Sequence, residues 1–179
     1  MKGIIFNITE SFITERFGDD VFDEIIESCS LTTREPFVSP GTYSDEDFIQ
    51  IVTAASRKLN ISTADFFKQL GHFAFFKLAG FYPQFVQSFS HPKEFLQTVD
   101  SIIHVEVRKL YSDTYLPVIS YSSPAPNVLV ITYFSQRKLY ALMEGLIAGV
   151  ADYFEVPLRQ THTLYQRDGK EYCDFELTF

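Results

Sequence analysis

The sequence is poor in the residues that most catalytic and metal-binding sites use. Its 179 residues include two cysteines, four histidines and no tryptophan. Cys29 and Cys173 lack C-x-x-C spacing, so neither a disulfide framework nor a cysteine zinc cluster is indicated, and both thiols are expected to be reduced. The sequence has no Gly-rich phosphate loop, no G-x-S-x-G and no H-E-x-x-H. These absences give little support for an enzyme.

Cationic residues and long apolar runs are also scarce. Fifteen Lys and Arg residues stand against 23 Asp and Glu residues, which gives a net charge of −8. Nucleic-acid binding needs clustered Lys and Arg, so this partner is not expected. No apolar run reaches the roughly 18 residues of a membrane span, and Asn7 and Glu10 interrupt the N-terminal apolar stretch too soon for a secretory signal. We therefore expect a cytoplasmic protein that does not bind membranes.

Aromatic residues are what the chain has in abundance. It contains 19 Phe and 10 Tyr, and 46% of its residues are hydrophobic. The length fits one domain, residues 1–179, with a sizeable core. This apolar material either forms a dense phenylalanine core or surrounds a large apolar ligand.

Hydrophobic periodicity predicts helices in the first two thirds of the chain. They are expected over residues 2–16 and 20–29, after Ser44, after Ser62, and over residues 92–110. Each of the two serines is followed three positions later by an aspartate, a pattern typical of helix N-caps. The stretch FFKQLGHFAFFKLAGF after Ser62 is apolar on nearly all sides, which predicts a deeply buried helix.

The last third of the sequence has the pattern of two hairpins separated by a helix. YLPVISY and VLVITYF flank the turn SSPAPN, and LRQTHTLYQ and EYCDFELTF flank Asp168-Gly169. An amphipathic helix is expected over residues 136–154. The predicted fold class is α+β: a mostly helical N-terminal half packed on a small four-stranded antiparallel sheet, with a long helix between the two hairpins.

His104 is the most informative single residue, because it stands among apolar neighbours in VDSIIHVEVRKLY, residues 99–111. On a helical wheel it falls about 110° from the centre of the apolar stripe, at its margin. It is therefore either a surface or half-buried histidine or a metal ligand. No second histidine lies close enough in sequence for a zinc site. A single imidazole suffices when the metal arrives already coordinated, as iron does in haem.

A second pattern, Tyr-x-Ser-x-Arg, lies in ITYFSQRKLY. Tyr133 and Ser135 are expected to point the same way at the end of a strand, and Arg137 to enter the following helix near its N-terminus. A phenol, a hydroxyl and a guanidinium at a helix start would bind carboxylates, such as the two propionates of haem. The pattern alone is not specific, since Ser135 could equally be an N-cap.

The stretches MKGIIFN, GHFAFF, IIHVEV, YFSQR and LMEGLIAGV together resemble the haem nitric oxide/oxygen binding (H-NOX) domains, including the haem domain of soluble guanylate cyclase. The resemblance covers essentially the whole chain. Its most specific part is Tyr-x-Ser-x-Arg beginning 29 residues beyond His104. It implies a haem b (iron protoporphyrin IX) between a distal helical part, about residues 1–62, and a proximal part, about residues 63–179.

The resemblance also implies a role for each candidate residue. His104 is expected to be the axial ligand of the haem iron. Tyr133, Ser135 and Arg137 are expected to hold the propionates. Pro117 matches the proline that presses on the haem and distorts it in the family.

Two departures from the family pattern bear on the expected function. The aspartate that often stands three residues before the histidine is Ser101 here, which predicts a weaker brace on that helix. The distal tyrosine of oxygen-binding members is replaced by Leu142. Tyr140 is no substitute, because two residues back along a helix turns it roughly 200° away. The expected distal pocket is apolar and consists of Ile5, Ala74, Leu142 and Leu146.

An apolar distal pocket favours NO and CO over O₂, because bound O₂ gains from a nearby hydrogen-bond donor and the other two gases do not need one. The chain is therefore expected to be a sensor without enzymatic activity. In this hypothesis NO breaks the bond between iron and His104, and the helix over residues 92–110 then shifts. The pressure from Pro117 relaxes at the same time. The changed surface would regulate a separate histidine kinase or diguanylate cyclase.

Some family members carry a zinc site near the C-terminus, of which only Cys173, together with His162, remains here. Two ligands do not close a tetrahedral site, so no structural zinc is expected.

The rival to the sensor is a haem-free binding or adaptor domain of the same fold, in which phenylalanine side chains fill the haem slot.

Overall fold

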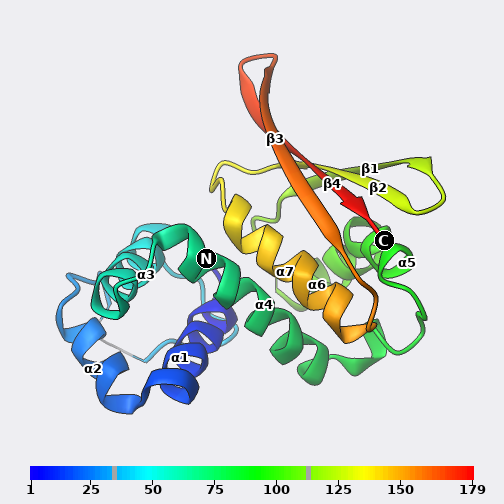
Figure 1. Cartoon of the computed structure of the whole chain (residues 1–179). Coiled ribbons are helices and arrows are strands. Elements are labelled where there is room, and N and C mark those ends of the chain that lie inside the picture. The colour runs from blue at the N-terminus through cyan, green and yellow to red at the C-terminus, as the bar shows by residue number, and fades with distance from the viewer. Residues whose placement is uncertain (34–35, 112–113) are drawn as a thin grey trace.

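The N-terminal part of the protein is a group of packed helices (Figure 1). A computed structural model describes residues 1–33, 36–111 and 114–179. The helices of this part are α1 (Gly3–Phe17), α2 (Asp19–Glu27), α3 (Asp45–Leu59) and α4 (Thr63–Phe81). The hydroxyl of Ser44 accepts from the backbone N–H of Glu46, and that of Ser62 accepts from Asp65 N–H, both at 3.0 Å. The predicted helix starts at the two serines are thereby confirmed.

The segment that follows α4 departs from the prediction of one continuous helix over residues 92–110. After the 3₁₀ turn η1 (Pro83–Phe85) it consists of α5 (Pro92–Leu96), the π-helical turn η2 (Val99–Ile103) and α6 (His104–Leu110). The backbone N–H of Asp100 donates to the hydroxyl of Tyr121 at 3.2 Å. This donor is therefore not part of the helical ladder. Ile102 N–H still bonds four residues back, to Thr98 at 2.8 Å, whereas the N–H groups of Ile103 and His104 bond five residues back.

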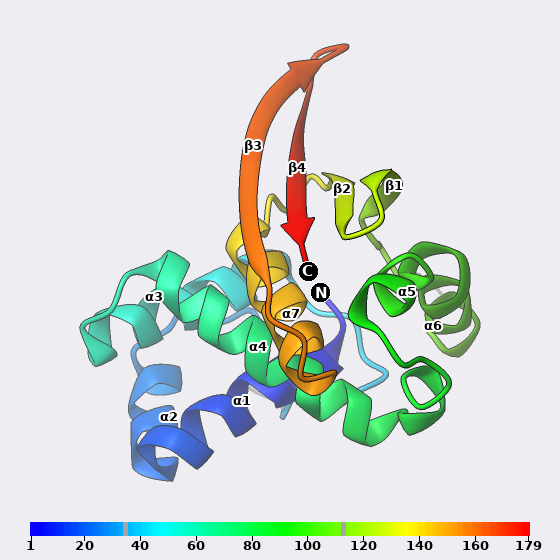
Figure 2. The same ribbon diagram turned by 45° about the vertical axis from the view of Figure 1, so that its right-hand side comes forward.

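The C-terminal part contains an antiparallel sheet of two hairpins (Figure 2). Its strands are β1 (Val118–Ala125), β2 (Val128–Phe134), β3 (Arg159–Arg167) and β4 (Lys170–Thr178), and their order is β1-β2-β4-β3. Helix α7 (Tyr140–Tyr153) joins the two hairpins. The predicted α+β class, with its four-stranded antiparallel sheet and connecting helix, is confirmed.

Helix α7 begins later than the predicted residue 136. Lys138 has a φ of 50°, a left-handed conformation that an α-helix does not contain. Ser135 instead accepts a hydrogen bond from the N–H of Arg137 at 3.2 Å within a turn that precedes the helix. The prediction that Arg137 enters the helix was wrong, because this turn separates β2 from α7.

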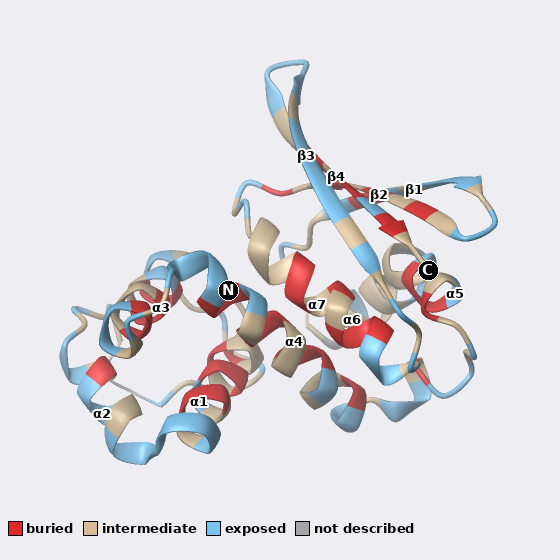
Figure 3. Cartoon of the chain, viewed as in Figure 1, coloured by how far each residue is buried: buried red, intermediate tan, exposed pale blue. Residues whose placement is uncertain are grey.

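Two clusters of buried side chains form the core, and helix α4 contributes to both. Buried residues recur along α4 (Figure 3). Phe66 and Leu70 pack with the other N-terminal helices, whereas Phe75 and Ala79 pack with α7 and the sheet. The proposed division into a distal and a proximal part near residue 62 coincides with the start of α4. Because α4 spans both clusters, it connects the two parts rigidly. That division stays a prediction.

Helices α4 and α7 cross at backbone contact distance. A Cβ atom on Gly71 would lie 2.2 Å from the carbonyl oxygen of Leu142, and one on Gly145 would lie 2.0 Å from that of Lys68. Both distances are far below a van der Waals contact, so only glycine allows this approach. Within the described ranges, no helix has the length and apolar character needed to cross a bilayer.

We expect Gly145→Ala to lower the free energy of unfolding by about 1–3 kcal/mol, because the added methyl group has to push two backbones apart. Urea denaturation followed by circular dichroism measures this change. The matched control is Gly80→Ala, since a Cβ at Gly80 meets nothing within 4 Å. That variant should be neutral or more stable by up to about 1 kcal/mol. Equal effects of the two changes would show that the helix crossing is not tightly packed.

Candidate functional site

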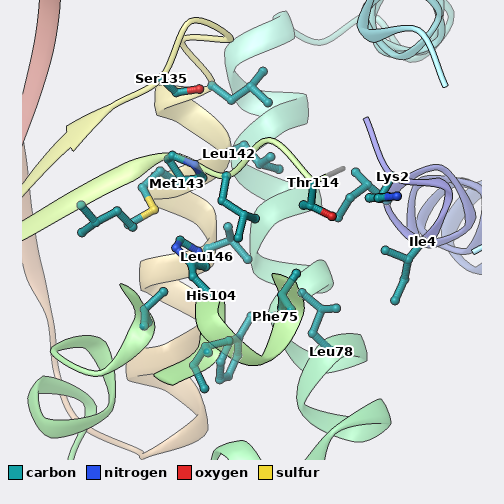
Figure 4. Close-up of a pocket in the computed structure, with 18 of the residues that line it drawn as sticks. Lys2, Ile4, Phe75, Leu78, His104, Thr114, Ser135, Leu142, Met143 and Leu146 are labelled. Atoms are coloured by element: carbon teal, nitrogen blue, oxygen red, sulfur yellow. The ribbon is translucent and has the colours of Figure 1, made fainter. Parts of the chain in front are cut away.

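A partly open cavity of about 350 Å³ lies between the helical part and the sheet part (Figure 4). Its volume falls within the roughly 300–1,000 Å³ that ligand and cofactor pockets usually have. Most of the lining side chains are apolar, and they include Ile4, Ile5, Phe75, Leu78, Val86, Leu96, Ile103, Leu142, Met143, Leu146 and Ile147. The abundant phenylalanines thus build a dense core and still leave an apolar space beside it.

His104 lines this cavity from the junction of η2 and α6. Its side chain is 12% exposed, and its Nδ1 lies 3.4 Å from a carboxylate oxygen of Asp100. Burial lowers the pKa of His104, although the Asp100 carboxylate acts in the opposite direction. The ring is thus favoured in its neutral form, the form that binds metals. No described residue donates or accepts a hydrogen bond at its Nε2.

Tyr133 and Ser135 stand at the end of β2, where both are buried and both line the cavity. Burial raises the pKa of Tyr133, so its hydroxyl remains a donor at neutral pH. Arg137 lines the cavity from the turn that follows. The structure therefore brings together the three residues of the Tyr-x-Ser-x-Arg pattern on one side of the cavity.

The guanidinium of Arg137 is held by two groups. Its Nε donates to a carboxylate oxygen of Asp45 at 2.7 Å, and its Nη1 donates to the carbonyl oxygen of Tyr115 at 2.6 Å. It also lies 4.8 Å from the centre of the Tyr115 ring. The Nη2 group has no partner among the described residues. Arg137 is thus positioned in advance and retains donors for an anionic group.

Asp45 is a site residue that the sequence analysis missed. It begins α3, and it also accepts from the amino group of Met1 at 2.6 Å. Partial burial would raise the pKa of Asp45, but the hydrogen bonds from Arg137 and the amino group outweigh this effect and lower it. In the sequence Asp45 resembles an ordinary acidic residue at a helix start. Nothing local indicates its bond to a residue 92 positions away.

The other predicted pocket residues are placed as follows. Ile5, Pro117, Leu142 and Leu146 all line the cavity. Ala74 does not, because it is buried in the core cluster of the N-terminal helices. Its predicted place in the distal pocket therefore stays a prediction, and α4 reaches the cavity through Phe75 and Leu78 instead.

Tyr140 is directed toward the sheet. Its hydroxyl donates to a carboxylate oxygen of Glu171 at 2.9 Å, and its ring lies 5.8 Å from that of Tyr133. It is not among the residues that line the cavity. Its hydroxyl is thus committed elsewhere, as the helical geometry indicated.

The C-terminal cysteine and histidine have separate environments. Cys173 is fully buried, and this burial raises the pKa of its thiol to about 12. His162 lies 2.7 Å from a carboxylate oxygen of Glu144 through its Nδ1. In the ranges that the structure describes, no three His, Cys, Asp or Glu side chains are grouped so as to hold a metal ion. The expected absence of structural zinc stays a prediction.

A family model described as haem-NO-binding matches residues 2–162 of the sequence. The chain belongs to this haem-NO-binding family. Solved H-NOX structures share its fold. An Fe(II)NO form from S. oneidensis is 30% identical with a TM-score of 0.90, covering 99% of this chain and 98% of that one.

Two further H-NOX structures agree with this assignment. An Fe(II)CO form from Shewanella oneidensis is 30% identical with a TM-score of 0.89, and the match covers 100% of this chain and 98% of that one. An unliganded Fe(II) form from K. algicida is 28% identical with a TM-score of 0.89, covering 99% and 96% of the two chains. Membership of the haem-NO-binding family identifies the cavity as the place to test for haem.

The donor set around the cavity fits a haem. The walls are apolar, and one neutral imidazole lines them with its Nε2 unpartnered among the described residues. A guanidinium with free donors and two buried hydroxyl groups line the same cavity, and such groups bind carboxylates such as propionates. The residues present would therefore offer a ligand to iron and hydrogen-bond donors to carboxylates.

We expect Asp45→Asn to lower the free energy of unfolding of the haem-free protein by about 0.2–1 kcal/mol at neutral pH, since Asp45 is partly exposed. The pKa of Asp45 is depressed by folding, so its contribution is present above the unfolded value of about 4 and is lost as the pH falls through the folded value. The difference should disappear in acid. Urea denaturation of both proteins across this pH range measures it, with Glu46→Gln as a control in the same helical turn. A difference that persists in acid would rule out this ion pair as its source.

Proposed function

We propose that this protein is a haem-based gas sensor that binds NO and CO at ferrous iron and does not hold O₂. The observation that carries the proposal is the isolated His104 imidazole on the wall of an apolar cavity whose lining also contains Ser135 and Arg137. The membership of the chain in the haem-NO-binding family supports the same function. Beyond family membership, the proposal names the residues that hold the haem and the gases that bind to its iron.

Each site residue has a defined task in this proposal. A bound haem b supplies the open iron position at which a diatomic gas binds. His104 holds the iron through Nε2, because its Nδ1 is already directed at Asp100. Arg137 binds a propionate through the donors left free by Asp45 and Tyr115, with Tyr133 and Ser135 as further hydrogen-bonding groups. Pro117 lines the same cavity immediately before β1 and would contact the cofactor there.

Discrimination between the gases is proposed to rest on the distal side chains. Ile5, Leu142 and Leu146 present only hydrocarbon to the cavity. The hydroxyl of Tyr140 is occupied by Glu171 and is not part of the lining. Bound O₂ carries partial negative charge and needs a hydrogen-bond donor for a long lifetime, whereas NO and CO bind without one. These residues therefore favour NO and CO.

Signalling is proposed to begin with the release of His104 when NO binds. His104 starts α6 directly after the π-helical turn η2, so its release removes one restraint on this segment. The resulting change of surface would regulate another protein in trans, either a histidine kinase or a diguanylate cyclase, and the domain itself would not be an enzyme. Related H-NOX proteins are known in NO and CO ligation states. The expected cytoplasmic location stays part of this proposal.

The rival is a haem-free adaptor in which side chains fill the slot. Phe75 and Phe95 do line the cavity, yet about 350 Å³ remains open beside them. A filled adaptor core would not be expected to leave a space of this size, because protein interiors are close-packed. The visible absorption spectrum of the purified protein, before and after addition of haemin, separates the two functions. A protein that stays colourless would end the sensor proposal.

We expect His104→Ala to lose haem, or to retain it only when imidazole is added, because the variant lacks the only described imidazole that lines the cavity. The Soret absorbance per mole of protein measures retention. His72→Ala is the matched control, since His72 pairs with Asp152 and does not line the cavity. Full haem content in His104→Ala without imidazole would assign the axial ligand to another residue.

We expect the reduced wild-type protein to show no stable oxy spectrum in air, because Leu142 offers no hydrogen bond to bound O₂. Leu142→Tyr should slow the dissociation of O₂ roughly tenfold, which corresponds to one hydrogen bond of about 1.4 kcal/mol. Flash photolysis with O₂ measures the rates. Leu142→Phe controls for ring size without a donor. A persistent ferrous-oxy spectrum in the wild-type protein would contradict the proposed selectivity.

A further inference from the structure

The π-helical turn η2 ends at the proposed axial ligand. The backbone N–H of His104 donates to the carbonyl oxygen of Val99, five residues earlier, and Ile103 N–H likewise reaches Thr98 at 3.4 Å. Single π-helical turns inside helices are rare and occur frequently at functional sites. The turn therefore raises the question of which neighbouring side chain it brings to His104.

The residue that meets the ring is Asp100. Its Oδ1 lies 3.4 Å from Nδ1 of His104, and its side chain is 40% exposed against 12% for His104. A carboxylate on Nδ1 fixes the tautomer that carries its proton there. It thereby leaves the lone pair on Nε2, the nitrogen without a partner among the described residues.

The π-helical register explains why this role falls to Asp100 and not to Ser101. In a turn closed by bonds five residues apart, each residue advances less around the axis than in an α-helix. The residue four positions before His104 therefore lies more nearly beneath it, and the residue three positions before rotates away. The structure agrees, because Ser101 is exposed while Asp100 contacts the ring.

A contact from the sheet fixes Asp100 in turn. The hydroxyl of Tyr121, on β1, accepts from the backbone N–H of Asp100 at 3.2 Å. Tyr121 is half-buried and packs against the core cluster of the sheet. The carboxylate is thus attached through its own backbone to the sheet, which does not depend on the iron for its position.

We propose that Asp100 is a positioning residue that orients the imidazole of His104 and strengthens its bond to iron. This inference rests on the proposed haem site. It assigns a role to Asp100, four residues before His104, whereas the family pattern has its aspartate three residues before the histidine, at the position of Ser101. A hydrogen-bonded carboxylate raises the basicity of a ligating imidazole. The strength with which iron is held, and hence the ease with which His104 is released, then depends on Asp100.

The experiment is resonance Raman spectroscopy of the unliganded ferrous protein in wild type, Asp100→Ala and Asp100→Asn. The band of the iron–histidine stretch should shift to lower frequency in Asp100→Ala and by a smaller amount in Asp100→Asn, whose amide still accepts a weaker hydrogen bond. Haem transfer to a haem-free acceptor protein should become about 10-fold faster in Asp100→Ala, the lower end of the loss seen on removing such partners. A purely structural role would lower stability without moving the Raman band.

Two control variants separate this role from general effects on the segment. Ser101→Ala alters the adjacent exposed residue, and Glu106→Gln removes a negative charge that pairs with Lys109. Both should leave the band in place. An unchanged band in Asp100→Ala, or in the isosteric Asp100→Asn if the alanine variant does not fold, overturns the inference while the haem site stands. A wild-type protein without haem overturns the proposed function and this inference together.

Discussion

The close crossing of α4 and α7 determines how the elements around the cavity are arranged. Gly71 and Gly145 let the two backbones touch, and α4 then contributes side chains to the core clusters on both sides. Because the crossing fixes α7 against α4, the two helices form adjoining walls of the cavity. The η2–α6 segment, the residues before β1 and residues of α1, α5 and β2 also contribute to its lining. An apolar space of this size survives in a close-packed core only where such a framework holds it open.

Asp45, Asp100 and Tyr121, which help to position the polar groups of the site, do not themselves line the cavity. Arg137 is held by Asp45 at the start of α3, so a contact from the N-terminal helices orients the proposed propionate-binding group. His104 is oriented by Asp100, which β1 fixes through Tyr121. Movement of either supporting element would change the geometry of the cavity. This arrangement gives the proposed sensor two physical connections between its ligand site and its surface.

The sequence predicted those features whose causes are local. The Ser44 and Ser62 caps, the two hairpins and the clustering of the Tyr-x-Ser-x-Arg residues follow from neighbouring residues or from the family resemblance. The π-helical turn was not predicted, and the hydrogen bond that accompanies it joins Asp100 to Tyr121, 21 residues away in sequence. The spacing of apolar residues over 92–110 fits an unbroken helix equally well, so it does not reveal the π-helical turn. The bond between Asp45 and Arg137 joins residues 92 positions apart and was equally invisible.

The proposed sensor depends on a bond between His104 and iron that NO breaks. Electron paramagnetic resonance of the ferrous protein with excess NO tests this claim most directly. If His104 leaves, the spectrum shows hyperfine splitting from the NO nitrogen alone, and labelling histidine with ¹⁵N changes nothing. Additional splitting from an imidazole nitrogen that responds to this label would show that His104 stays bound, and would contradict the account.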